Sequence, residues 1–162
     1  MILNFLNELQ NLINDLREKN SFDEFKDGLE KLKHISSHLI EAESHHKREE
    51  DVLFPRIAKY GITEPVEIMK LDHIEYRERK KKLYDIATNN KKYSFEEFKK
   101  NVIEIGEYLV RELQSHIFKE DNILYQIALQ TLNEKDWEEV KKECDKIGYC
   151  CFTPSDRLEE GK

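Results

Sequence analysis

Apolar side chains recur at intervals of three and four positions along most of the chain, which is the spacing of one face of an α-helix. The first such stripe comprises Ile2, Phe5, Leu6, Leu9, Leu12, Ile13 and Leu16. A second stripe begins at Phe22 and runs to about Tyr60. Pro55 lies inside the second stripe and is expected to kink that helix or to begin its end.

Three further helices are predicted beyond the second stripe. They span about residues 65–87, 94–131 and 134–147. Only five Gly and three Pro occur in 162 residues, which leaves little room for the many turns of a β-sandwich or barrel. The sequence therefore predicts an all-α fold in one domain over residues 1–148, followed by a C-terminal tail over residues 149–162.

The second and fourth predicted helices carry an internal repeat. Each opens on a capping-box sequence, Ser21–Glu24 and Ser94–Glu97, in which Ser and Glu can satisfy free N–H groups at a helix start. A histidine follows the capping Ser by 24 residues in the first copy and by 22 in the second. Two such helices, each with an antiparallel partner, make a four-helix bundle, to which the segment over 134–147 adds a short fifth helix.

The repeat also places His-x-x-x-Glu in both copies, as His45/Glu49 and His116/Glu120. Residues four apart lie on one face of a helix, so each pair presents an imidazole and a carboxylate together. These nitrogen and oxygen donors suit iron, manganese or zinc, and carboxylates that bridge two cations would let two metals lie side by side. Metal coordination would also explain the burial of these groups, which is costly without a partner.

Adjacent copies of both residue types leave the register of the first pair ambiguous, because His45/Glu49 and His46/Glu50 have the same spacing. Alignment of the repeat favours His45 and Glu49 as the primary ligands, since they superpose on the second pair. His46 is then either an additional ligand or an exposed side chain. Glu50 is expected to be solvated or to support the ligands from outside.

A third histidine is predicted to reach the same level of the bundle. His73 precedes Ser94 by 21 residues and His116 follows it by 22, so antiparallel helices bring both imidazoles to about the same height. His73 is therefore expected to join His116 and Glu120. The counterpart of His73 in the first helix would fall at about position 0, before Met1, so we expect either a trimmed start or a metal with an open position.

Together these residues resemble the hemerythrin-type HHE cation-binding domain over roughly residues 1–130. The resemblance rests on His45-x-x-x-Glu49-Glu50-x-x-Leu53-Phe54-Pro55, His73 and His116-x-x-x-Glu120. It implies an up-down-up-down bundle around a non-haem di-iron centre that binds dioxygen or a related small ligand. The loop Gly61–Pro65 and the end of the last helix, Trp137–Tyr149, are more similar to a prokaryotic subgroup that is often fused to other regulatory domains.

The sequence departs from the family in two places. The first predicted helix contains no histidine, and Arg77 lies four residues after His73, where oxygen-carrying members have a second histidine. Both departures argue against reversible oxygen carriage more than against metal binding. The predicted cofactor is a pair of iron ions, with manganese or zinc as alternatives. The predicted metal ligands are His45, Glu49, His73, His116, Glu120 and, as the additional ligand, His46.

Three functions are compatible with these features. The first is a di-iron module that binds or senses a small ligand, either beside a regulatory partner domain or in a homodimer whose second chain supplies the missing ligand. The second is an oxidase or peroxidase that uses the open position, which metal catalysis requires. The sequence shows no dedicated substrate pocket or general base for that second function. The third is a metal-poor helical interaction domain.

Charge and hydropathy exclude other classes of protein. A net charge of −7 argues against nucleic-acid binding, and the basic run Arg77–Lys82 is interpreted as a solvated helix face. No run approaches the ~18 apolar residues of a membrane span, and the N-terminus does not resemble a signal peptide. Three Cys do not make a disulfide framework, so a reducing cytoplasm is expected.

Some candidate ligands are interpreted as structural. His38 precedes His45 by seven residues, about 10 Å along a helix, which is too far for one compact metal pair. His34 lies farther away still. The three cysteines are expected to be small apolar or tail residues, because the adjacent pair lacks the spacing of a metal motif. They are Cys144, Cys150 and Cys151.

Overall fold

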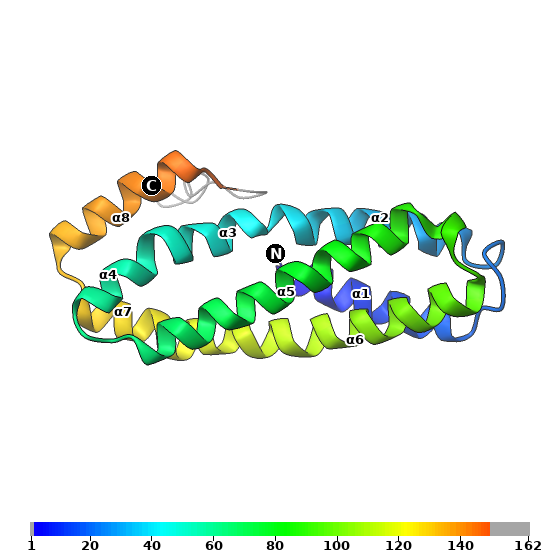
Figure 1. Cartoon of the computed structure of the whole chain (residues 1–162), viewed down its shortest axis with the longest axis horizontal. Coiled ribbons are helices and arrows are strands. Elements are labelled where there is room, and N and C mark those ends of the chain that lie inside the picture. Colours follow the sequence, from blue (N-terminus) through cyan, green and yellow to red (C-terminus); the bar gives the residue numbers. More distant parts are fainter. Residues whose placement is uncertain (1, 150–162) are drawn as a thin grey trace, which may run out of the picture.

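A computed structural model describes residues 2–149, and every regular element among them is helical (Figure 1). Three short elements are not α-helices: η1 and η3 are π-helical turns, and η2 is a 3₁₀ turn. The elements in chain order are α1 Ile2–Arg17, α2 Lys26–Glu41, α3 Glu43–Arg48, η1 Glu49–Leu53, α4 Phe54–Lys59, α5 Glu64–Thr88, η2 Asn90–Lys92, α6 Phe95–Lys119, η3 Glu120–Leu124, α7 Tyr125–Thr131 and α8 Glu134–Ile147.

The segments form the predicted antiparallel four-helix bundle. Its four columns are α1, then α2 to α4, then α5, and finally α6 to α7. Neighbouring columns pack in a ring, and α4 also contacts α7. Column α1 has 16 residues and covers only one end of the bundle, whereas the other columns continue past it (Figure 1). The fifth helix, α8, lies along α3 and η1 at the opposite end.

The two capping-box sequences behave differently. Ser94 caps α6 as predicted: its hydroxyl accepts from the backbone of Glu97, whose side chain reaches back to the Ser94 N–H. In the first copy Ser21 also accepts from the Glu24 N–H, at 3.2 Å, but Glu24 reaches the N–H of Asn20, at 2.8 Å. Turns follow, and α2 starts only at Lys26. The repeat is therefore looser at the start of its first copy.

The kink expected at Pro55 is a π-helical turn. The column breaks briefly after α2, and η1 then precedes α4, in which Pro55 stands in the first turn. A proline is tolerated there, because its missing N–H falls where helical bonding restarts. The second copy has an equivalent turn, η3, without any proline. Pro55 therefore accommodates the turn and is not its general cause.

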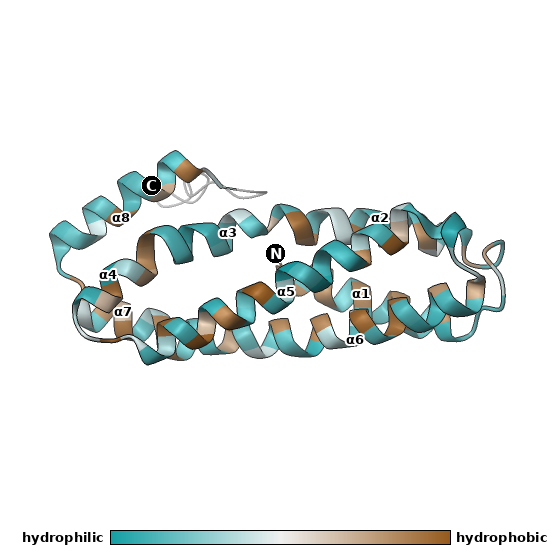
Figure 2. Ribbon diagram, viewed as in Figure 1, coloured by the Kyte–Doolittle hydropathy of each residue, from teal (hydrophilic) through white to brown (hydrophobic). Residues whose placement is uncertain are grey.

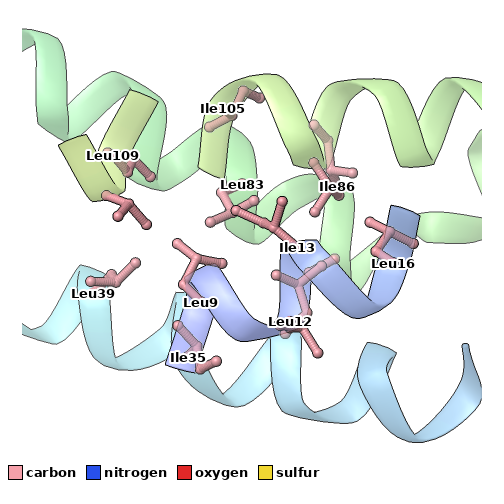
Figure 3. Packing of buried hydrophobic residues seen from close by; sticks show 14 of the residues in the cluster. Leu9, Leu12, Ile13, Leu16, Ile35, Leu39, Leu83, Ile86, Ile105 and Leu109 are labelled. Atoms are coloured by element: carbon pink, nitrogen blue, oxygen red, sulfur yellow. The ribbon is translucent and has the colours of Figure 1, made fainter. Parts of the chain in front are cut away.

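Two separate apolar clusters fill the bundle. Each helix carries brown apolar segments between teal ones, as expected of helices with one buried face (Figure 2). The larger cluster surrounds α1, whose leucines and Ile13 meet side chains of α2, α5 and α6 (Figure 3). The smaller cluster joins α4, the start of α5, α7 and α8. Its α8 members include Val140, Trp137 and Cys144, which form the inner face of that helix.

The basic run on α5 is only partly a solvated face. Lys80 is 1% exposed, and its amine lies 2.9 Å from Glu43 Oε1. Arg77 is half-buried and pairs with Glu43 and Glu50. The interpretation of Arg77–Lys82 as solvated is therefore wrong for these two residues, because acidic side chains on the neighbouring column face them.

Three observations complete the description of the fold: the extent of the described chain, the search for a membrane span and one cavity. Cys150, Cys151 and the rest of the predicted tail lie outside the described residues, apart from Tyr149. No helix within residues 2–149 is long and apolar enough to cross a membrane. A cavity of about 770 Å³ opens between α1 and α2, and its lining includes Leu12, Gly28 and His34.

Ser94→Ala is expected to lower the free energy of unfolding by about 1 kcal/mol, because α6 loses the hydroxyl that accepts from the Glu97 N–H. Ser21→Ala provides a matched control from the other copy of the repeat. Its cost should be clearly smaller, since α2 begins only at Lys26. Urea denaturation of the two variants measures both values, and equal losses would contradict the difference between the two helix starts.

Candidate metal centre

A layer of buried polar side chains separates the two apolar clusters. It contains five imidazole and carboxylate groups that are at most 5% exposed, namely His46, Glu49, His73, His116 and Glu120. They come from three columns of the bundle, through α3, η1, α5, α6 and η3. Burying such groups without partners is costly, so their interactions decide what the layer can do.

Both carboxylates of this layer stand at the start of a π-helical turn. Glu49 opens η1 and Glu120 opens η3, so the two copies of the repeat share the same local distortion at the same position. A π-turn adds one residue to the helix without breaking it, and such turns are frequent at functional sites. The turns thus confirm the alignment that pairs Glu49 with Glu120.

The first group of donors is fully buried. One ligand atom from each of His46, His73, His116 and Glu120 lies within 4.8 Å of all the others. The Nε2 atoms of His73 and His116 are 2.9 Å apart, and His116 Nε2 is 2.8 Å from Glu120 Oε1. The rings of His46 and His73 stack with centroids 4.0 Å apart. Three imidazoles and a carboxylate therefore converge on one point.

A second group of donors adjoins the first and is more open. It consists of His45, Glu49 and Glu120, again with one atom of each within 4.8 Å of the others. His45 Nε2 lies 3.5 Å from Glu49 Oε1 and 3.7 Å from Glu120 Oε2. The side chain of His45 is 39% exposed, whereas both carboxylates are buried. Glu120 belongs to both groups and offers one oxygen to each.

The ligand atoms are arranged to bind a cation and cannot all form hydrogen bonds with one another. Glu49 Oε2 and Glu120 Oε1 are buried without a hydrogen-bond partner, although each lies near an imidazole. Of the two facing Nε2 atoms of His73 and His116, only one can donate a proton to the other. A cation would accept lone pairs from all of these atoms at once. The residues present therefore fit a metal ion.

Electrostatics leads to the same conclusion. Burial, together with the neighbouring Glu120 carboxylate, raises the pKa of Glu49 to about 7. Burial also lowers the pKa of His46 to about 4 and that of His73 further. These histidines are neutral near pH 7 and keep a lone pair for a metal. Burial thus disfavours the charged forms of Glu49, His46 and His73, whereas the neighbouring His116 and His45 hold the pKa of Glu120 below its usual range.

The structure brings all six predicted ligands into the two groups. His46 is not exposed, which leaves the additional-ligand alternative. Glu50 supports the cluster from outside, because its Oε1 lies 2.8 Å from His73 Nδ1. His34 and His38 stand apart from both groups and contact the ring of Phe5. That the six residues hold a metal stays a prediction.

Sequence reasoning missed three side chains that contact the predicted ligands. The Tyr125 hydroxyl donates to Glu49 Oε1 at 2.6 Å, and Asp72 Oδ2 lies 3.1 Å from His116 Nδ1. Glu43 lies 3.3 Å from His46 Nδ1. Of these three contacts, only that of Glu43 could have been predicted from the sequence, since Glu43 precedes His46 by about one helical turn. The other two come from different columns and required the packed bundle.

Comparison with known families agrees with this geometry. The sequence profile of the family described as Hemerythrin HHE cation binding domain matches residues 1–128. This chain belongs to the hemerythrin HHE cation-binding family. No curated protein matches the chain. In this hemerythrin-type domain the matched residues include every predicted ligand, whereas α8 lies beyond them.

Glu49→Gln is expected to stabilise the metal-free protein by about 1 kcal/mol, or a few degrees in melting temperature. The amide removes a buried negative charge beside Glu120 and can still accept from the Tyr125 hydroxyl. Thermal unfolding in excess chelator is the measurement. Glu139→Gln serves as the control, because that half-exposed carboxylate faces Arg56 instead and should change little. A clear drop in melting temperature for Glu49→Gln would show that its carboxylate stabilises the apo fold.

Proposed function

We propose that this domain holds a dinuclear non-haem iron centre that binds dioxygen or a related small ligand. The observation that carries the proposal is the sharing of Glu120 between two adjacent groups of donors. Glu49 also faces both groups, since its Oε2 is 3.4 Å from His73 Nε2 and its Oε1 is 3.5 Å from His45. Two carboxylates that span both groups are suited to bridging two cations.

Different residues of the chain would bind each of the two metal ions. His73, His116 and His46 would bind one ion, His45 the other, and Glu49 and Glu120 would bridge them. Imidazole and carboxylate donors of this kind suit iron. When bound, ferrous iron supplies electrons and an open coordination position to a small ligand. Tyr125 would keep Glu49 oriented through its hydrogen bond.

Ligand access would be on the His45 side. The group around His45 has three protein donors and the group around His73 has four, with Glu120 counted in both. His45 is also the only candidate ligand within the described residues that is not buried. Helix α1 contributes no donor to either group. The His45 position therefore has both the coordination space and the exposure that a small ligand needs.

Metal content should follow the assignment of the donors to the two groups. Chain loaded anaerobically with Fe²⁺ is expected to retain two iron ions, one for each group. Glu120→Ala should retain almost none, because it removes a donor from both groups. His45→Ala and His73→Ala should each lose about one ion, since each touches one group. Metal analysis after gel filtration gives the stoichiometry.

His34→Ala is the matched control and should keep the wild-type content, because His34 lies outside both groups. Well under one ion per wild-type chain would contradict the proposal and favour a metal-poor interaction domain. A visible absorption band that responds to dioxygen, azide or nitric oxide would support small-ligand binding. Peroxide consumed over many turnovers would indicate an oxidase or peroxidase instead.

A further inference from the structure

Each buried imidazole of the first donor group has a carboxylate against its outer nitrogen. Glu50 Oε1 lies 2.8 Å from His73 Nδ1, and Asp72 Oδ2 lies 3.1 Å from His116 Nδ1. Glu43 Oε1 lies 3.3 Å from His46 Nδ1, close enough for attraction but angled away from a good hydrogen bond. The half-exposed His45 has no such partner among the contacts of the described residues.

Two of these outer carboxylates are held by cations of α5. Lys80 Nζ lies 2.9 Å from Glu43 Oε1, and Arg77 Nε lies 2.9 Å from Glu43 Oε2. Arg77 also reaches Glu50 Oε1 at 3.0 Å. Arg77 therefore joins Glu43 and Glu50 through one guanidinium, and Lys80 adds a second positive charge behind Glu43.

The burial of Lys80 carries a large desolvation cost, so its ion pair contributes little net stability to the fold. Its side chain is 1% exposed, so its ammonium has lost nearly all its hydration. Burial lowers the pKa of Lys80, although Glu43 opposes that change. Replacement of a buried ion pair by apolar side chains of similar volume is often neutral or stabilising. The pair thus calls for a role other than packing.

We propose that Lys80 and Arg77 are positioning residues of the metal centre that act through Glu43 and Glu50. By fixing the two carboxylates, they keep acceptors against Nδ1 of His46 and His73. Each ring then carries its proton on Nδ1 and leaves Nε2 for a metal, as outer carboxylates do for metal-bound histidines in general. This inference rests on the proposed function, because the imidazoles matter here as ligands.

The test compares Lys80→Met with Arg79→Met on the same helix. Arg79 pairs with Glu75, which contacts none of the imidazoles. Fe²⁺ affinity, measured anaerobically by competition with a chelator, is expected to fall 10- to 100-fold in Lys80→Met and to stay near wild type in Arg79→Met. Lys80→Met leaves Glu43 paired only with Arg77, so the chelated variant is expected to melt at a lower temperature, and affinities are compared where both variants are folded. An unchanged affinity in Lys80→Met, or a loss equal in both variants, would overturn the inference.

A double-mutant cycle separates positioning from general damage. If Lys80 acts through Glu43, the Glu43→Gln/Lys80→Met double variant loses little more affinity than Glu43→Gln alone. Additive losses would overturn the inference. Should Lys80→Met fail to fold, Arg77→Gln replaces it, because Arg77 is half-buried and holds the same carboxylate. Arg77→Gln is then expected to lower the Fe²⁺ affinity 10- to 100-fold, and an unchanged affinity would overturn the inference.

Nuclear magnetic resonance of the histidine rings gives a readout that a merely structural role would not move. In the Zn²⁺-loaded wild type, His46 and His73 should each show a protonated Nδ1, and the His46 signal should weaken or shift in Lys80→Met. Protonation of Nε2 in the loaded wild type would overturn the inference. A wild type that binds no Fe²⁺ would contradict the proposed function itself. Tight Fe²⁺ binding that is indifferent to Lys80 would contradict only the positioning role.

Discussion

The structure depends on one constraint, which is that ionisable side chains lie in a closed layer between two apolar clusters. The layer removes Glu49, Glu120 and three imidazoles from water in the middle of a bundle that is apolar on both sides. In this setting an unpaired charge is costly, so each group must be neutral, ion-paired or bound to a cation. Outer carboxylates, buried cations and raised or lowered pKa values are responses to that constraint.

The internal repeat explains how one short motif produces a site with two positions. Each copy contains His-x-x-x-Glu, whose Glu begins a π-helical turn, and the bundle places the two copies across from each other. The copies are nevertheless unequal. The first has two adjacent histidines, one buried and one half-exposed, whereas the second has a single buried histidine. A near-symmetric fold thereby carries an asymmetric set of donors.

Periodicity and spacing predicted the helices and the height of His73, because both follow from a constant rise per residue. The same reasoning missed the charges on α5. From the sequence Lys80 is one member of a basic run, and its burial against Glu43 depends on the rotation of two columns about their axes. The π-turns were also invisible, since their residues have ordinary helical composition. The late start of α2 was not predicted either, and there Glu24 accepts from the Asn20 N–H instead of the Ser21 N–H.

Helix α8 packs against the half of the site that is formed by α3 and η1. It lies against α3 and η1, where it is fastened by Arg56 to Glu139 and Glu143 and by Arg48 to the carbonyl of Gly148. Those two arginines bracket the π-turn that begins at Glu49. The contacts of α8 therefore lie directly beside this π-turn. The side of the donor layer that carries His45 and Glu49 is therefore braced by contacts with the last helix of the described chain.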